Sequence, residues 1–358
     1  MKYADITGWG KCLPPAVLTN TDLSTILDTD DEWIVSRTGM QERRISHVEL
    51  VDLCVVAARR AMACANVTAE QLDLIVLGTT TPDTLCPNVA SGVQKALGAW
   101  NAGCVDVNTA CTGFTYGLSM ASNMIKTGSI KRALVIGGEV ISRLMDWTDR
   151  SVAVLFGDGA GAVVIEASDE ESGVIGEKLG CSGDVREILE IKNFGGSSTG
   201  KIIGDTEWQF VGPEIFKRAV LGMGKASEDL LAQLGFSGDD IDLIVPHQAN
   251  LRIIDAVAKK VKAPEEKVFI NVQRYGNMSA ATIIVALNEA IEEGRVKPGS
   301  LLLLPAFGAG LTWTAQVVRW GRRVTPLSTS DAELPPCEET ALELIARKNA
   351  LVEASKPQ

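Results

Sequence analysis

Among the 358 residues of this chain, Cys111 is the one whose type and position most clearly suggest catalytic chemistry. It is one of eight cysteines. It lies between a strand-like run, VDVN (105–108), and a stretch with helical spacing of apolar and small residues, TGFTYGLSMASNMI (112–125). Free amides and the helix dipole at a helix N-terminus stabilise a thiolate, so we expect a lowered pKa for Cys111. Such a thiolate could hold an acyl group as a thioester; for any one cysteine the alternative is a buried core thiol.

Two more polar residues, His247 and Asn277, follow other expected strands. The chain has only two histidines. His247 comes directly after the apolar run 241–245 and Pro246, whereas His47 lies in a polar stretch and is expected at the surface. Read alone, a histidine is usually a surface or satisfied core residue, and Gly-Asn is a turn signal. At a strand end, the side-chain amide of Asn277 could instead donate to an oxygen that becomes negative during a reaction, and His247 would lie level with the first-half site.

The elements that would position these residues occur twice along the chain. Apolar runs of strand length recur in the same order, the first two pairs being 169 and 168 positions apart: 72–76 with 241–245, 132–136 with 300–304, and 160–167 with 313–320. Such runs, separated by helix-length segments, are typical of strands covered on both faces. We therefore expect two similar α/β halves, residues 1–168 and 169–321, with ligands bound where their strand ends meet.

Composition argues against several classes of protein. A formal net charge of −11 is unlike that of nucleic-acid-binding proteins, which need a basic surface. The longest apolar runs are shorter than the roughly 20 residues of a membrane helix, and the N-terminus lacks the apolar core of a signal peptide. The eight cysteines form no CxxC pair, which favours reduced thiols over disulfides or a zinc site. We expect a cytoplasmic protein that binds neither nucleic acid nor membrane.

Six motifs carry a family resemblance over about residues 1–321. They are DEWIVSRTGMQERRI (31–45), NTACTGF (108–114), DRSVAVLFGDGAGA (149–162), PHQANLRI (246–253), GNMSAAT (276–282) and FGAGLTW (307–313). With these motifs the chain resembles the β-ketoacyl-acyl-carrier-protein synthase III family, the initiating condensing enzymes of bacterial fatty-acid synthesis. The resemblance implies a homodimer of the thiolase fold, in which two duplicated α/β halves pack as a five-layered αβαβα core.

The resemblance also implies a reaction. Cys111 would take an acyl group from acyl-CoA, and malonyl-acyl-carrier-protein would then lose CO2 and attack the acyl thioester. His247 and Asn277 would stabilise the malonyl enolate, and the backbone amides of Cys111 and Ala309 would bind the tetrahedral oxyanion. CoA thioesters are substrates in this scheme, so neither a cofactor nor a metal is expected.

Substrate and partner contacts follow from the same motif matches. The expected contacts are Trp33 with Arg150 on the adenine, Arg37 on phosphate, Phe216 and Asn250 in the pantetheine tunnel, and Cys86 at the acyl end of the partner subunit's pocket. A basic surface for the acidic carrier protein would comprise Lys217, Arg252, Lys259 and Lys260, although a solvated helix face also explains such charges.

Three positions depart from the family pattern. Cys86 stands where a large aromatic residue is common, which predicts a deeper acyl pocket. Ala309 replaces a glycine, so its methyl group would narrow the loop, and Met278 would add bulk near the site.

Residues 322–358 extend past the usual end of the family. A Pro-rich linker is followed by helical spacing of the apolar residues Ala341, Leu344, Ile345, Leu351 and Val352. This spacing predicts an added helix that packs on the body or on a partner.

Two other functions stay open. Cys-His-Asn as the catalytic set disfavours degradative thiolases and chain-elongating synthases, which use a second cysteine or a second histidine. A specialised acyltransferase or condensing enzyme of secondary metabolism on the same fold is the enzymatic alternative. A non-catalytic acyl-CoA-binding protein is the alternative from another class.

Overall fold

The main sheet holds the strands that the sequence analysis predicted. A computed structural model describes residues 2–192 and 207–354 of the chain. Among these residues the main sheet has nine strands in the order β11-β12-β13-β8-β1-β7-β6-β4-β5. Their bounds are β1 (Tyr3–Cys12), β4 (Leu74–Gly78), β5 (Gly103–Val107), β6 (Arg132–Glu139), β7 (Gly159–Ser168), β8 (Gly173–Cys181), β11 (Leu243–Ile244), β12 (Leu301–Gly308) and β13 (Thr312–Arg319). Two small antiparallel ribbons pair β2 (Ala16–Thr19) with β3 (Glu42–Ile45) and β9 (Leu189–Lys192) with β10 (Glu207–Phe210).

The main sheet consists of two halves with the same internal arrangement. In one half β4 pairs parallel with β6, β6 antiparallel with β7, and β7 antiparallel with β1. In the other half β11 pairs parallel with β12, β12 antiparallel with β13, and β13 antiparallel with β8. The recurring runs of the sequence thus occupy equivalent strands, β4 and β11, β6 and β12, β7 and β13. The domain boundaries at 168 and 321 stay predictions.

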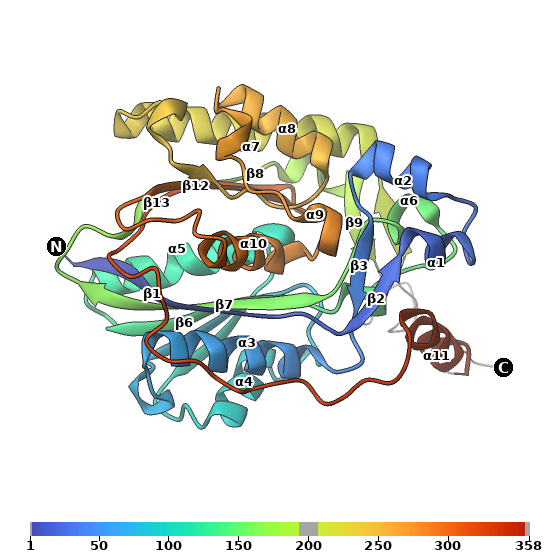
Figure 1. Ribbon diagram of the computed structural model, residues 1–358, viewed down its shortest axis with the longest axis horizontal. Helices are drawn as coiled ribbons and strands as arrows, with labels where there is room; N and C mark the ends of the chain where they lie inside the picture. Colours follow the sequence, from blue (N-terminus) through green and yellow to red (C-terminus); the bar gives the residue numbers. More distant parts are fainter. Residues whose placement is uncertain (1, 193–206, 355–358) are drawn as a thin grey trace.

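Five alternating layers of helix and sheet are visible in Figure 1. The helices α7 (Gly212–Leu234) and α8 (Leu251–Lys260) cover the outer face of the half with β12 and β13. The helices α3 (Leu50–Ala65) and α4 (Val89–Leu97) cover the outer face of the other half. Between the two halves lie α5 (Gly113–Lys126) and α10 (Thr282–Glu292). This arrangement confirms the expected αβαβα core.

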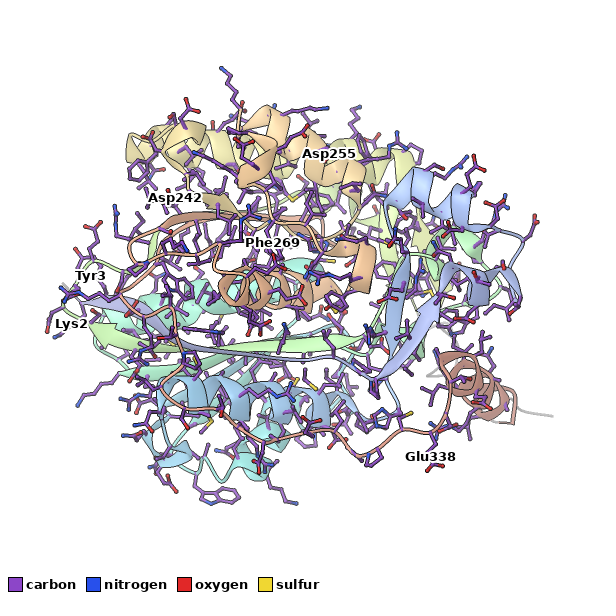
Figure 2. All side chains as sticks on the ribbon, viewed as in Figure 1. Lys2, Tyr3, Asp242, Asp255, Phe269 and Glu338 are labelled. Atoms are coloured by element: carbon purple, nitrogen blue, oxygen red, sulfur yellow. The ribbon has the colours of Figure 1, made fainter. Side chains whose placement is uncertain are left out.

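The central helices are enclosed on all sides. Every residue of α10 from Thr282 to Ile291 is buried, as expected for a helix between the two halves of the main sheet. A Cβ on Gly78 of β4 would lie 2.3 Å from the backbone carbonyl carbon of Gly113, so only a glycine lets this strand contact the start of α5. Figure 2 shows Phe269 within these inner layers, whereas Asp255 projects from α8 at the outside. Strand ends and helix starts therefore meet in a rigid interior.

Shorter helices flank this core, and the C-terminal extension wraps around it. They are α1 (Asn20–Ser24), α2 (Asp31–Thr38), α6 (Arg150–Ala153) and α9 (Val272–Tyr275). After β13 the chain passes α3 and reaches a last helix, α11 (Ala341–Ala354), beside β2 and β3 (Figure 1). On the way, the backbone N–H of Leu327 donates to the carbonyl oxygen of Cys64 at 3.0 Å, and Arg60 donates to that of Ala332 at 3.0 Å.

The last helix packs on the body of the protein through its first turns. Ala341, Leu344 and Ile345 are buried, which confirms the predicted added helix. Leu351 is 67% exposed in the single chain, so it does not pack on the body, and its packing on a partner stays a prediction. The side chain of Val352 lies outside the described ones. None of the described helices is long and apolar enough to cross a bilayer.

Candidate active site

A cavity of 1080 Å³ brings the predicted chemical residues together. Cys111, His247 and Asn277 all line it. The cavity wall also includes Trp33, Arg37, Thr80, Ile141, Leu144, Trp208, Phe216, Asn250, Arg252, Ser279 and Ala309. The described residues contain no group of three or more His, Cys, Asp or Glu side chains that could hold a metal ion. The cavity wall presents a thiol, an imidazole, hydroxyls, amides, guanidinium groups and a carboxylate.

Cys111 occupies the predicted strand-to-helix junction. The strand β5 ends at Val107, and a 3-10 turn over Ala110–Thr112 leads directly into α5. Ala110, just before the cysteine, has a φ of 50°, a left-handed conformation that non-glycine residues seldom adopt. A Cβ on Gly308 would lie 2.8 Å from the backbone nitrogen of Cys111, so the glycine at the end of β12 is required for this close approach. Strands of both halves thus fix the thiol in place.

Burial has the largest effect on the pKa of the Cys111 thiol. It raises the pKa of the thiol to about 12, opposed by hydrogen bonds from Ser279, from the backbone of Cys111 and from Asn277, while the nearby charge of Glu139 raises the pKa further. The expected lowering of this pKa was wrong, because desolvation of the thiolate outweighs the stabilisation that the helix N-terminus and the hydrogen bonds provide. The thiol is therefore the resting form, and its proton must leave when a substrate binds.

His247 is buried and neutral at physiological pH. Burial lowers the pKa of its imidazole to about 3. Its Nδ1 lies 2.6 Å from the hydroxyl oxygen of Thr282, which also lies 3.1 Å from the carbonyl oxygen of Ser279. This hydroxyl has one proton: given to Nδ1, it leaves Nε2 as an N–H donor, and given to Ser279, it leaves Nε2 as an acceptor. The direction of the Thr282 hydroxyl therefore sets what His247 offers to a ligand.

Asn277 is held by hydrogen bonds that leave its amide nitrogen for the cavity. Its backbone N–H donates to the carbonyl oxygen of Leu155 at 2.9 Å, and its carbonyl accepts from Gly157 at 3.1 Å. Its side-chain oxygen accepts from the backbone N–H of Ser279 at 2.8 Å. The side-chain NH2 group is thus directed to the cavity, where it hydrogen-bonds the thiol of Cys111. The turn that Gly-Asn predicts is also present, since Gly276 has a φ of 61°.

Three polar residues of the site were missed by the sequence analysis: Thr282, Ser279 and Glu139. Glu139 is fully buried at the end of β6, where its carboxylate accepts hydrogen bonds from the side chains of residues 79–81, the shortest being 2.6 Å. The Ser279 hydroxyl bonds both this carboxylate and the thiol of Cys111. Glu139 could have been identified from the sequence as the acidic residue that ends the apolar run RALVIGGE. No sequence feature distinguished Ser279 and Thr282 from ordinary hydroxyl residues near a Gly-Asn turn.

The predicted CoA contacts lie at the cavity or next to it. Trp33 and Arg37 share one face of α2 as expected, and the guanidinium carbon of Arg37 lies 4.4 Å from the Trp33 ring centroid. The guanidinium carbon of Arg150 lies 5.1 Å from the same centroid. Phe216 and Asn250 line the cavity, whereas Arg150 approaches it through Trp33. One aromatic ring flanked by two cations suits a planar base with phosphates.

The four candidate docking residues differ in their surroundings. Arg252 lines the cavity, with its guanidinium carbon 5.7 Å from the Phe216 ring centroid. Lys217 and Lys259 are exposed on α7 and α8. Lys260 is partly buried and lies 3.6 Å from Glu228, which offsets its charge. Lys260 therefore contributes least to a basic surface.

The three departures from the family pattern also differ in outcome. Ala309 lines the cavity, as expected for a loop residue beside the thiol. Met278 is fully buried and packs with Tyr275 and Val285, so the expected bulk near the site was wrong: the side chain points into the core behind the turn. Cys86 is exposed in the single chain. Its role in a partner's pocket stays a prediction.

Comparisons with known proteins agree with this site. The family model described as 3-oxoacyl-[acyl-carrier-protein] synthase III matches residues 105–183, and the model of its C-terminal part matches residues 231–320. The chain is 52% identical over 347 residues to "Beta-ketoacyl-[acyl-carrier-protein] synthase III 2" of Vibrio cholerae, covering 96% of each chain. It is 45% identical to the "Beta-ketoacyl-[acyl-carrier-protein] synthase III" of Xanthomonas axonopodis, covering 89% of this chain and 98% of that one.

Solved structures give the same result. The 3-oxoacyl-[acyl-carrier-protein] synthase III of Aquifex aeolicus superposes with a TM-score of 0.84 at 44% identity, covering 88% of this chain and 100% of that one. Motifs, fold, site and relatives together show that the chain belongs to the β-ketoacyl-[acyl-carrier-protein] synthase III family.

Proposed function

We propose that the protein condenses an acyl-CoA primer with malonyl-acyl-carrier-protein. The products are β-ketoacyl-acyl-carrier-protein, CoA and CO2, and the reaction initiates fatty-acid synthesis. The observation that carries this function is one cavity that joins a thiol, a neutral imidazole and a side-chain amide to an aromatic ring with two guanidinium groups beside it. The names of the relatives, which cover nearly the whole chain, support the same reaction.

In the first half-reaction the acyl group moves from CoA to Cys111. The thiol attacks the thioester carbonyl while Nε2 of His247 accepts its proton, with the Thr282 hydroxyl turned toward Ser279. The proton then passes to the departing CoA sulfur, so one C–S bond forms and one breaks without net charge. The backbone amides of Cys111 and Ala309 hold the tetrahedral oxyanion.

In the second half-reaction a malonyl thioester occupies the cavity. Loss of CO2 leaves an electron pair that spreads onto the thioester oxygen as an enolate. The side-chain NH2 of Asn277 and Nε2–H of His247 donate to this oxygen. Between the two half-reactions the ring gives its Nδ1 proton to water and takes one from water at Nε2, and the Thr282 hydroxyl turns toward Nδ1. The enolate carbon attacks the acyl thioester, and the Cys111 sulfur leaves and takes a proton from solvent. The imidazole is therefore neutral at the start of each step, and it holds the thiol proton only transiently in the first.

We also propose that the active protein is a homodimer paired through the edge of its sheet. The strand β5 lies at the end of the main sheet and is only partly buried, and Leu85 and Trp100 nearby are 76% and 69% exposed. Exposed apolar side chains beside an open strand edge favour pairing with a second copy. Cys86 lies next to Leu85, so this pairing would carry it toward the partner's cavity.

The carrier protein would approach the mouth of the cavity. Arg252 at the cavity, with the exposed Lys217 and Lys259, offers positive charge to an acidic partner in a chain that is itself acidic overall. Such surface charges steer association and are screened by salt. The acceptor's affinity should therefore fall as ionic strength rises.

Reconstitution tests the proposed function. Purified protein is incubated with a series of acyl-CoAs and malonyl-acyl-carrier-protein, and the carrier protein is analysed by mass spectrometry. We expect its mass to change from malonyl to β-ketoacyl, with equimolar release of CO2. A non-catalytic acyl-CoA-binding protein would bind the thioesters and leave the carrier protein unchanged, which would refute the proposal. Transfer to a small-molecule acceptor in place of the carrier protein would favour the secondary-metabolism alternative.

A further inference from the structure

The helix α11 carries a lysine on the face that it buries. Ala341, Leu344 and Ile345 form that face, and Lys348 occupies the next position of the same helical stripe. Burial lowers the pKa of its ammonium to about 7. Placing an ammonium in such surroundings is unfavourable, so packing of α11 alone does not explain a lysine at this position.

The partly buried ammonium group of Lys348 holds a turn that forms part of the cavity wall. The Nζ of Lys348 donates to the carbonyl oxygen of Ser142, in the 3-10 turn Ile141–Leu144. Ile141 and Leu144, on either side of Ser142, line the cavity with Cys111. The extension therefore reaches the substrate cavity through one turn.

The same turn is fixed from its other side. The backbone N–H and hydroxyl of Ser142 donate to the carboxylate of Asp158 at 2.9 and 2.6 Å, and Asp158 is fully buried. The indole N–H of Trp208, another lining residue, donates to the carbonyl oxygen of Leu144 at 2.7 Å. The attraction of Asp158 for Lys348 opposes the desolvation of the ammonium, and repulsion by Arg143 adds to it. Lys348, Asp158 and Trp208 thus hold the turn Ile141–Leu144 by hydrogen bonds from different sides, and we call these three residues the polar clamp.

The Lys348 part of the polar clamp is an addition to the family's common body. The family model ends at residue 320, and the Xanthomonas and Aquifex proteins cover 89% and 88% of this chain. The Vibrio cholerae relative aligns over 347 residues, more than residues 1–321 can supply. The extension therefore distinguishes this chain, with its Vibrio relative, from the shorter members.

We propose that α11 is a specificity element that limits the length of the acyl chain placed on Cys111. By holding the turn Ile141–Leu144 through Lys348, it fixes the width of the cavity at Ile141 and Leu144. Lys348 is a positioning residue, since it acts on the substrate through this turn. The inference rests on the proposed acyl transfer and adds the element that selects the acyl group.

Replacing the lysine within the full-length protein tests this role. Lys348→Met keeps the apolar stem and removes the ammonium, so the turn can move outward. The readout is the rate of acylation of Cys111 by acetyl-CoA and by dodecanoyl-CoA, followed by intact-protein mass. We expect the ratio of kcat/KM for dodecanoyl-CoA to that for acetyl-CoA to rise about tenfold, roughly what two newly accommodated methylenes contribute.

Matched variants separate selectivity from general damage. Arg347→Met changes the exposed neighbour on the same helix and should leave the ratio unchanged, and Lys348→Arg should keep it near the wild-type value. If Lys348→Met does not fold, Lys348→Gln is measured in the same way. A ratio within about twofold of wild type in a folded, acylated variant would overturn the inference and spare the proposed function. A wild-type protein that takes no acyl group from any CoA thioester would overturn both.

Discussion

The hydroxyl of Thr282 is the least expected part of the site, and its removal should slow decarboxylation. Thr282→Val keeps the shape of a fully buried side chain and leaves Nδ1 of His247 without its partner at 2.6 Å. A neutral hydrogen bond contributes about 1 kcal/mol net. Since about 1.4 kcal/mol corresponds to a factor of ten in rate, CO2 release from malonyl-acyl-carrier-protein should fall roughly five- to tenfold. Thermal unfolding should shift by only a few degrees.

The assay follows labelled CO2 from malonyl-acyl-carrier-protein under single-turnover conditions with pre-acylated protein. Thr282→Ser is the matched control, because it retains the hydroxyl and should keep most of the rate. Wild-type CO2 release in Thr282→Val would refute the claim that this hydroxyl sets the state of His247. A loss in Thr282→Ser as large as in Thr282→Val would assign the effect to packing instead.

Three further predictions address other parts of the account. Asn277→Ala should leave acylation of Cys111 intact and slow CO2 release roughly a hundredfold or more, the effect of removing one oxyanion donor. Normal release would deny Asn277 that role. Burial lowers the pKa of His247 to about 3, so below about pH 6.5 the unfolded chain binds a proton at this imidazole and the native protein does not. The free energy of unfolding should therefore fall as pH falls toward 3, by up to about 1.4 kcal/mol per pH unit. In His247→Gln the free energy of unfolding, measured with urea between pH 7.5 and 5, should depend less steeply on pH than in the wild type. An equally steep dependence on pH would contradict the lowered pKa of His247. Cys86→Phe should shift the preferred acyl-CoA toward acetyl if Cys86 reaches the partner's pocket, and an unchanged chain-length profile would remove Cys86 from it.

The strand ends and their side chains were predictable because a buried strand leaves a local pattern. The apolar runs before Cys111 and His247 placed both residues at strand ends, and the repeated order of runs anticipated two equivalent half-sheets. Motif spacing placed Trp33 and Arg37 on one helix face. These features depend on residues close in sequence.

What the sequence did not give depends on surroundings built from distant segments. The pKa of Cys111 was expected to fall, because its local setting is a helix start, yet enclosure by both halves raises it. Met278 was placed near the cavity by its neighbour Asn277, but its side chain turns into the core. Glu139 escaped notice because its hydrogen-bond partners lie about 60 residues earlier in the chain. Side-chain direction and burial are tertiary properties.

The central claim is that the Cys111 thiol carries the acyl group. The most direct measurement is intact-protein and peptide mass spectrometry after brief exposure to a panel of acyl-CoAs. We expect one added acyl group per chain, located on the peptide containing Cys111, labile to hydroxylamine as a thioester, and absent from Cys111→Ser. An acyl group on another of the eight cysteines with Cys111 unmodified, or no covalent adduct with any acyl-CoA, would contradict it.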